Sequence, residues 1–208
     1  LPEEKIAKYP PKERGKSKLM VIDRNTAEIQ HKKYADMVES FEPGDVLVIN
    51  TTKVEKVRVF FTNQRNNREV ESLFLNKINR GDSNEIESWE CLFQNSRKVK
   101  EGDVLLSKTS EYKVEVEKKL EDGIFLVTTG MGVSEKIFNE DGEVPLPPYI
   151  DRAQEDSDHV RYNTIFAEIS GSAAAPTAAL NMTPELFEKL EEKGVKIACV
   201  VNVESSTM

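Results

Sequence analysis

The strongest constraint on the fold lies in residues 59–144, where short apolar runs alternate with turn signals. Runs rich in Val, Ile, Leu and Phe recur roughly every ten residues, and helical periodicity nearly vanishes. Asp122-Gly123 is a strong hairpin signal. We expect hairpins between Glu69–Ile78 and Ile86–Gln94, with the turn at 79–84, and between Tyr112–Lys118 and Ile124–Thr129. This segment therefore predicts a small antiparallel barrel or sandwich.

The residues on either side of this segment predict further strands and short helices. The run VLVIN at Val46–Asn50 is continuously apolar before its final Asn, which predicts a strand buried on both faces. Three prolines make Val144–Ile150 a stiff, extended connector. The other expected elements are a hairpin of Leu19–Asp23 with Glu28–Lys32, a brief helix at Ser134–Asn139 and a strand at Val195–Val203.

The stretch Gly171–Thr183 and the helix after it combine unusual composition with clear local geometry. Thr183 is a typical N-cap, and Pro184 fits the first helical position because its missing N–H has no partner there. We expect the helix to run from Pro184 to Lys193, before Gly194. Small residues fill the preceding loop, so the helix N-terminus suits an anion or a polar ligand. The alternative is that this alanine-rich loop only packs against a sheet.

Charge and composition limit the classes of partner. The 208 residues allow one large or two small domains, and 29 Lys and Arg against 37 Asp and Glu give a net charge of −8. An acidic protein does not hold nucleic acid over its whole surface, although a local basic patch can. Two segments are locally basic: the arm Leu1–Lys18 and the cluster of Arg97, Lys98 and Lys100. Each is a candidate phosphate contact, with a solvated surface segment as the alternative.

The cysteines and histidines do not form a metal-binding pattern. Cys91 and Cys199 stand far apart, and the chain has only His31 and His159 in addition, so neither a structural zinc site nor a disulfide framework is expected. This usage fits a reducing, cytoplasmic setting. No apolar run approaches the roughly 20 residues that cross a bilayer, so we expect no membrane association. We also expect a monomer, and a protein that continues beyond Met208.

Polar residues gather where the strand Val46–Asn50 ends. Asn50 and Thr52 lie at this point, with Arg58 a little further along. Polar groups at the end of a buried strand are common ligand contacts in mixed sheets. The alternative is that the Asn and Thr side chains satisfy their own turn.

Several motifs together resemble one enzyme family. The run AAPTAALNMTPEL at 174–186 resembles AAPTAGLHFTPEL of the S-adenosylmethionine:tRNA ribosyltransferase-isomerases of queuosine biosynthesis. The segment VPLPPYI at 144–150 matches that family without departure. Further matches lie in the N-terminal pattern from Leu1 to His31, at Arg97–Asp103 and at Arg161–Ala167. The resemblance therefore covers the chain in order.

The resemblance implies a mixed α/β (α+β) fold: a main domain built from residues 1–58 and 145–208, with an antiparallel barrel inserted at 59–144. It implies an enzyme that transfers the ribosyl part of S-adenosylmethionine to a 7-deazaguanine base at the tRNA wobble position and isomerises it, releasing adenine and methionine. S-adenosylmethionine is a substrate here, tRNA is the partner, and no metal is required. The expected catalytic positions are Asn181 and Thr183, and the substrate-binding ones are Asn50, Thr52, Arg58, Thr177 and Thr207. Arg97, Lys98 and Lys100 would contact RNA.

Two departures from the family pattern bear on activity. Asn181 stands where the family has His, and Asn202 stands where the family motif HVGLGTF begins with His. Asn cannot exchange a proton near neutral pH, so acid or base chemistry at these positions is lost. Three hypotheses follow: a working ribosyltransferase-isomerase; a divergent paralogue with altered or lost catalysis that keeps a nucleoside-binding pocket; and a non-catalytic RNA-binding module.

Overall fold

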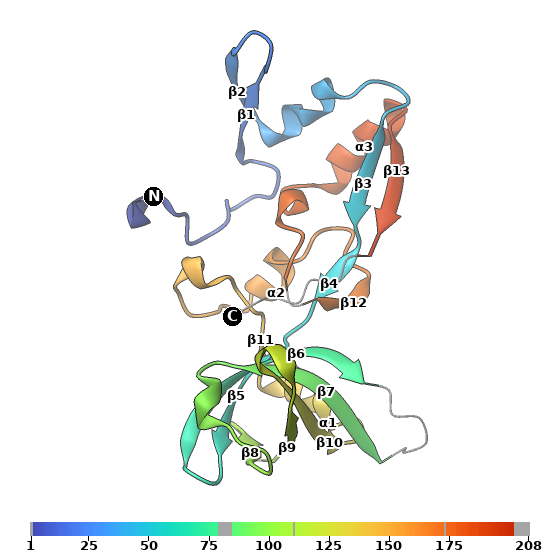
Figure 1. Ribbon diagram of the computed structural model, residues 1–208. Coiled ribbons are helices and arrows are strands. Elements are labelled where there is room, and N and C mark those ends of the chain that lie inside the picture. The colour runs from blue at the N-terminus through green and yellow to red at the C-terminus, as the bar shows by residue number, and fades with distance from the viewer. Residues whose placement is uncertain (1, 79–84, 110, 173, 202–208) are drawn as a thin grey trace. The chain divides into compact units, whose positions relative to one another are not determined.

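The computed structural model describes residues 2–78, 85–109, 111–172 and 174–201, and Figure 1 shows their course. The chain divides into two compact units. The main unit holds the described residues of 1–53, 147–170 and 175–202, and the barrel unit holds those of 54–146 and 171–174. These bounds fall at 53/54 and 146/147, where the sequence predicts 58/59 and 144/145. The division into separate domains stays a prediction.

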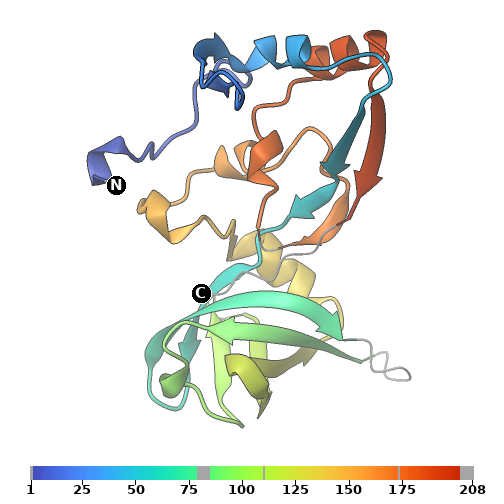
Figure 2. The same cartoon turned by 45° about the horizontal axis from the view of Figure 1, so that its top comes forward.

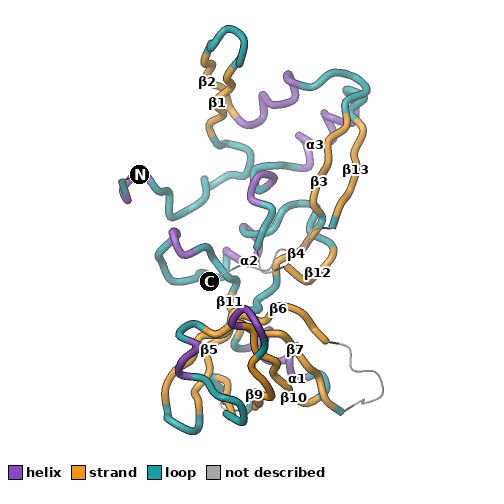
Figure 3. Tube along the Cα trace, viewed as in Figure 1, coloured by secondary structure: helices purple, strands orange, loops and turns teal. Residues whose placement is uncertain are grey.

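The barrel unit is a closed ring of six antiparallel strands. The strands follow each other in the order β5, β6, β7, β10, β9 and β8, and β8 pairs back onto β5. Strands are coloured orange in Figure 3. This closure resolves the alternative of barrel or sandwich in favour of the barrel. The bounds are Arg58–Asn63 (β5), Arg68–Ile78 (β6), Ile86–Phe93 (β7), Val104–Ser107 (β8), Lys113–Lys119 (β9) and Ile124–Gly130 (β10), with the short Gly142–Glu143 (β11) added on β5.

Both predicted hairpins of the barrel are confirmed. β6 pairs with β7 in the register Phe74↔Cys91, and β9 pairs with β10 in the register Val116↔Val127. The turn predicted at 79–84 lies outside the described residues. Burial alternates along β9, where Val114 and Val116 face inward between exposed charged residues. A period of two is the pattern that places one face of a strand on a core.

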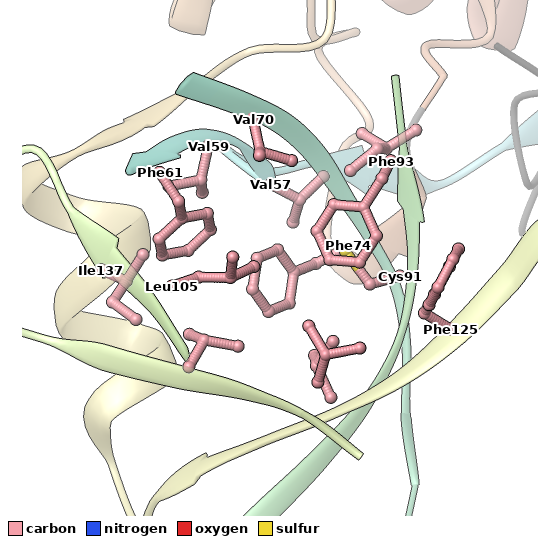
Figure 4. Close-up of a cluster of buried hydrophobic side chains, with 14 of the residues drawn as sticks. Val57, Val59, Phe61, Val70, Phe74, Cys91, Phe93, Leu105, Phe125 and Ile137 are labelled. Carbon is pink, nitrogen blue, oxygen red and sulfur yellow. The ribbon is translucent and has the colours of Figure 1, made fainter. Parts of the chain in front are cut away.

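The interior of the barrel is aromatic and aliphatic. Figure 4 shows side chains from several strands converging, among them Phe61, Phe74 and Leu105. The helix α1 (Val133–Glu140), which confirms the predicted brief helix, adds Ile137 and Phe138 to this core. The rings of Phe74 and Phe138 meet edge to face, with centroids 5.1 Å apart.

Gly142 lies where the chain leaves α1. A Cβ at this position would stand 2.1 Å from the Lys56 carbonyl oxygen and 2.4 Å from that of Phe138. Only glycine allows this close approach of three backbone segments.

A buried carboxylate fixes one end of the barrel. Asp103 is 3% exposed, and its carboxylate accepts hydrogen bonds from Asn63 Nδ2 at 2.6 Å and from Arg65 Nε at 2.6 Å. The backbone N–H of Lys100 donates to the same group at 2.9 Å. The Arg65 guanidinium is the main cause that lowers the pKa of Asp103 to about 2. Burying this charge is tolerable because its oxygens are paired with donors.

The main unit consists of small two-stranded sheets and short helices. β1 (Lys18–Ile22) and β2 (Ile29–Lys33) form the predicted antiparallel hairpin, and β3 (Val46–Asn50) runs parallel to β13 (Lys196–Val200), beside it in Figures 1 and 2. β4 (Thr52–Val54) pairs with β12 (Ile169–Ser172). The α-helices are α2 (Asp158–Arg161) and α3 (Pro184–Glu192). Short 3-10 helices occur in this unit at Glu3–Lys5, Tyr34–Ser40, Pro148–Ile150 and Thr177–Ala179, and in the barrel unit at Ser96–Lys98 and Glu121–Gly123.

Two expectations about these elements need correction. β3 is not buried on both faces, since Val46 is 57% and Val48 58% exposed. Side chains alternate along a strand, so only Leu47 and Ile49 reach the core formed with Leu186, Leu190 and Val195. The proline-rich connector is not extended throughout, because a 3-10 turn forms at Pro148–Ile150. Proline is tolerated in the first turn of a helix because its missing N–H has no partner there.

The cap of α3 can be tested by its effect on stability. We expect Thr183→Ala to reduce the free energy of opening of this helix by about 1 kcal/mol, because the hydroxyl that accepts from the Leu186 N–H is lost. Hydrogen exchange at the amide of Leu190, which is fully buried, measures this change. Thr183→Ser should retain protection, and the exposed Thr177→Ala should have no effect. Unchanged exchange in Thr183→Ala would contradict the capping role.

The depressed pKa of Asp103 makes barrel stability depend on pH. A carboxyl whose pKa is about 2 when folded stabilises the protein above its unfolded pKa near 3.8, and that contribution disappears as the pH falls towards 2. We expect Asp103→Asn to remove this contribution, on the order of 2 kcal/mol of the free energy of unfolding. The stabilities of the variant and the parent should therefore differ most at neutral pH. Urea unfolding followed by fluorescence of Trp89, the single tryptophan, reports on the barrel. Asp122→Asn, at an exposed turn, is the matched control. If the stability difference between Asp103→Asn and the parent did not change with pH, the role of the Asp103 charge would be contradicted.

Candidate functional site

The loop before α3 has the geometry that the sequence predicts. Thr183 is extended, and its Oγ1 accepts from the Leu186 N–H at 3.2 Å, which confirms the N-cap, while Pro184 occupies the first helical position. Glu185 lies in the first turn, and its pKa is lowered mainly by its own backbone N–H and then by the Thr183 hydroxyl. This helix end is therefore partly satisfied by the chain's own carboxylate, and its positive dipole end alone does not define a ligand site.

A segment far away in sequence meets this loop. Ser17 Oγ donates to Asn181 Oδ1 at 2.6 Å. Gly15 has φ +83°, and a Cβ on it would lie 2.8 Å from Thr183 Cγ2, so this position requires glycine. Sequence reasoning did not select Ser17 as a site residue. Its only signal was its place among the matched positions of the N-terminal family pattern.

Tyr34 ties the two segments together. Its backbone N–H donates to the Ser17 carbonyl at 2.9 Å, and its hydroxyl donates to the Ala178 carbonyl at 3.2 Å. Burial raises the pKa of this phenol, so it remains a neutral donor at any physiological pH. The Ser17–Asn181 contact is thus flanked by a second bridge between the same two segments.

Asn50 and Thr52 lie together at the end of β3. Asn50 Oδ1 accepts from the backbone N–H of Thr52 at 2.9 Å and from its hydroxyl. Thr52 is fully buried, and Thr51 next to it accepts at its carbonyl from the N–H groups of Glu168 and Ile169. These contacts agree with the alternative in which Asn and Thr satisfy their own turn. A direct substrate contact at these two residues stays a prediction.

The remaining predicted substrate-binding residues are dispersed. Arg58 belongs to the barrel unit, where its Nε lies 2.6 Å from Glu71 Oε1, and its guanidinium stacks over the Phe60 ring at 5.0 Å. Thr177 is exposed at the start of a 3-10 turn. Thr207 lies outside the described residues, as does Asn202.

The predicted RNA-binding residues lie together on one fixed loop. Arg97, Lys98 and Lys100 are exposed, while Val99 between them is 5% exposed and anchors the loop in the barrel core. The Lys98 carbonyl accepts from Arg65 Nη2 at 3.1 Å, and Lys100 donates its backbone N–H to the buried Asp103 carboxylate. The three cations therefore project from a backbone whose conformation is set by internal hydrogen bonds.

Part of the basic N-terminal arm is paired with the protein itself. Lys8 Nζ lies 3.3 Å from Asp151 Oδ2, and both terminal nitrogens of Arg14 donate to the Asn163 carbonyl at 2.9 Å. Burial is the main cause that lowers the pKa of Arg14. Lys16 lies 3.7 Å from Glu13. The main candidates in this arm for contacting phosphate are therefore Lys5, Lys12 and Lys18, which are exposed.

Clusters of metal-binding side chains and membrane-spanning helices are the next features to consider for a site. Within the described ranges, no group of three or more His, Cys, Asp or Glu side chains could hold a metal ion. Cys91 is buried and Cys199 is exposed, and both are free thiols. In the part of the chain that the structure describes, no helix is long and apolar enough to cross a membrane.

Comparison with known proteins gives consistent matches along the chain. The chain is 41% identical over 199 residues to an S-adenosylmethionine:tRNA ribosyltransferase-isomerase of Chlorobium phaeobacteroides, covering 95% of this chain and 55% of that protein. A Staphylococcus aureus protein of the same name is 39% identical over 201 residues, covering 96% and 57% respectively. A solved S-adenosylmethionine tRNA ribosyltransferase from Thermotoga maritima is 29% identical, with a TM-score of 0.37 and coverage of 97% and 55%.

The chain thus spans a little over half the length of the curated relatives it matches. A family model described as queuosine biosynthesis protein matches residues 1–207, a range that includes Ser17 and the loop that carries Asn181 and Thr183. The resemblance inferred from separate motifs is therefore confirmed over almost the whole sequence, and the chain belongs to the queuosine biosynthesis protein family.

Proposed function

We propose that this chain forms part of an enzyme that transfers the ribosyl moiety of S-adenosylmethionine to a 7-deazaguanine base at the tRNA wobble position and isomerises it. Adenine and methionine leave in this reaction. The observation that carries the proposal is the family match over residues 1–207, together with relatives near 40% identity that are named for this activity. Because the chain spans only part of those relatives, the complete reaction is proposed for the protein as a whole.

The loop before α3 is the proposed catalytic position. Thr183 uses its hydroxyl oxygen as the helix cap, and its hydroxyl proton is donated to the Glu185 carboxylate, whose pKa it lowers. Asn181 offers a carboxamide, which forms hydrogen bonds but takes no proton near neutral pH. The proton next to the sulfonium must then be removed by another group, and Asn181 serves to hold the substrate or the departing adenine.

The other proposed contacts follow the sequence prediction. Asn50, Thr52, Arg58, Thr177 and Thr207 are proposed as substrate-binding residues, with Thr52 requiring a rearrangement because it is fully buried. Arg97, Lys98 and Lys100 are proposed to meet the phosphate backbone of tRNA, which their exposure and their fixed loop support. The protein is proposed to act in the cytoplasm as a monomer, without membrane association. The reaction is a proton abstraction and a group transfer, and neither step requires a metal ion.

The first test is turnover on precursor tRNA. We expect the parent chain to release adenine from S-adenosylmethionine slowly, and Asn181→His to raise the rate, because imidazole can exchange a proton at this position. Liquid chromatography of adenine and of the modified nucleoside measures both products. Asn181→Gln, which keeps the amide but lengthens the side chain, is the control and should not raise the rate.

The outcomes separate the three hypotheses. A parent chain already as fast as Asn181→His would show that Asn181 does not mark altered catalysis. Binding of S-adenosylmethionine without turnover, also after Asn181→His and Asn202→His together, would favour the divergent paralogue. Binding of tRNA without binding of S-adenosylmethionine would favour the non-catalytic RNA-binding module.

The second test concerns the basic cluster. Each phosphate neutralised by Lys or Arg releases counterions, so tRNA affinity should fall steeply with salt concentration. We expect charge reversal of both Arg97 and Lys100 to weaken tRNA binding by more than about tenfold at low salt and to flatten the salt dependence. Charge reversal of both Lys118 and Lys136, which are also exposed, is the matched control. Equal losses in both variants would mean that only net charge matters and would remove the specific role of the cluster.

A further inference from the structure

The contact between Ser17 and Asn181 sets which end of the Asn181 amide a ligand can meet. A carboxamide has a carbonyl oxygen that accepts and a nitrogen that donates two hydrogen bonds. Ser17 Oγ donates to the oxygen at 2.6 Å, which occupies one of the two lone pairs of the accepting end. The amide plane is then fixed by a partner that lies 164 residues away in the chain.

The donating end of the same amide remains available. Among the described residues, none accepts a hydrogen bond from Asn181 Nδ2. A buried side-chain nitrogen without a partner would be an unsatisfied polar atom, and Nδ2 is not such an atom. Nδ2 is therefore accessible. A ligand that approaches Nδ2 meets two N–H donors.

The surroundings hold this orientation. Tyr34 joins the Ser17 backbone to the Ala178 backbone, and Gly15 packs directly against Thr183 Cγ2. The hydroxyl of Ser17 thus reaches Asn181 from a segment that is itself positioned by two independent contacts. A side chain held in this way loses little further entropy when it binds a ligand.

We propose that Ser17 is a positioning residue that turns the Asn181 carboxamide so that Nδ2 donates to a hydrogen-bond acceptor of the ligand. The acceptor is a ring nitrogen, a carbonyl oxygen or a carboxylate oxygen, and a donor group of the ligand would be rejected. The inference deepens the proposed function and rests on it for the identity of the ligand, which is S-adenosylmethionine. The Ser17–Asn181 coupling itself does not depend on that activity.

The coupling is tested on the free chain by nuclear magnetic resonance. The Asn181 side-chain NH2 group should be rigid in the parent and in Ser17→Thr, which keeps a hydroxyl. In Ser17→Ala its order parameter should fall below about 0.6, the range of flexible groups. Well-dispersed backbone spectra show that each variant is folded. An equally rigid amide in Ser17→Ala overturns the positioning role, whether or not the chain is an active enzyme.

The consequence for binding is tested by calorimetry with S-adenosylmethionine. Ser17→Ala should weaken binding by about tenfold, the scale of one well-placed hydrogen bond. In the Asn181→Leu background, Ser17→Ala should cause no further loss, because Ser17 acts only through Asn181. Equal losses in both backgrounds would indicate a general structural effect and overturn the proposal.

Asn181→Asp separates the two ends of the amide. Its carboxylate still accepts from Ser17 but presents an acceptor where the parent presents a donor. Affinity for S-adenosylmethionine should therefore fall at least as far as in Asn181→Leu. Parent-like binding by Asn181→Asp would overturn the donor assignment. If the parent chain binds no S-adenosylmethionine at all, the proposed function fails for this chain, while the resonance measurement still decides the coupling of Ser17 and Asn181.

Discussion

The pairing of β5 with β8 is the interaction on which the barrel unit depends. β5 uses one edge for two partners: Gly142–Glu143 pairs with its first residues, and β8 pairs with its last ones. Closing the ring leaves no long free edge among these strands, and it surrounds a core that a flat sheet could not enclose. The closure also brings Asn63 at the end of β5 next to Asp103, just before β8, so the buried carboxylate network forms where the ring closes. The basic loop with Arg97, Lys98 and Lys100 directly precedes Asp103, so the same network fixes its conformation.

The main unit is stabilised differently, and this difference explains how the side chains of the candidate site are held. Its sheets have two strands each, so hydrogen bonding between strands supplies little of the tertiary order. Besides the β3–β13 and β4–β12 pairings, side chains of the N-terminal segment join it to later loops, as Arg14 does to the Asn163 carbonyl and Ser17 to Asn181. A loop of small residues packs closely against such a segment because it has little side-chain volume of its own. The same close packing orders the functional side chains, which would be mobile on an isolated loop.

The sequence predicted those features whose cause is local. Asp122-Gly123 forces a turn, alternation along Lys113–Lys119 forces one face inward, and Thr183-Pro184 caps a helix, so hairpins and helix start could be placed. The pairing of β5 with β8 and the Ser17–Asn181 contact have no local signal, because they depend on how distant segments come together. Burial of β3 was predicted wrongly for the same reason: an apolar run shows that a strand can be covered, and only its neighbours decide whether it is. Of the candidate site, Asn181 and Thr183 were found through motif and cap, whereas the contacts that Gly15 and Ser17 make with them could only come from the structure.

The orientation of the Asn181 amide shows which property of a histidine an asparagine can replace at this position and which it cannot. An imidazole has one nitrogen that donates and one that accepts when neutral, so a hydroxyl at the position of Ser17 could fix its tautomer by donating to the accepting nitrogen. The other nitrogen would then carry a proton towards the ligand. In the proposed orientation, Asn181 would reproduce this arrangement, with its oxygen accepting from Ser17 and an N–H facing the ligand. What the amide lacks is the ability to give that proton away, since its pKa lies far outside the physiological range. On this proposal, substrate recognition at this position is retained in an Asn-containing chain while proton transfer is lost, and the two contributions separate as binding and turnover.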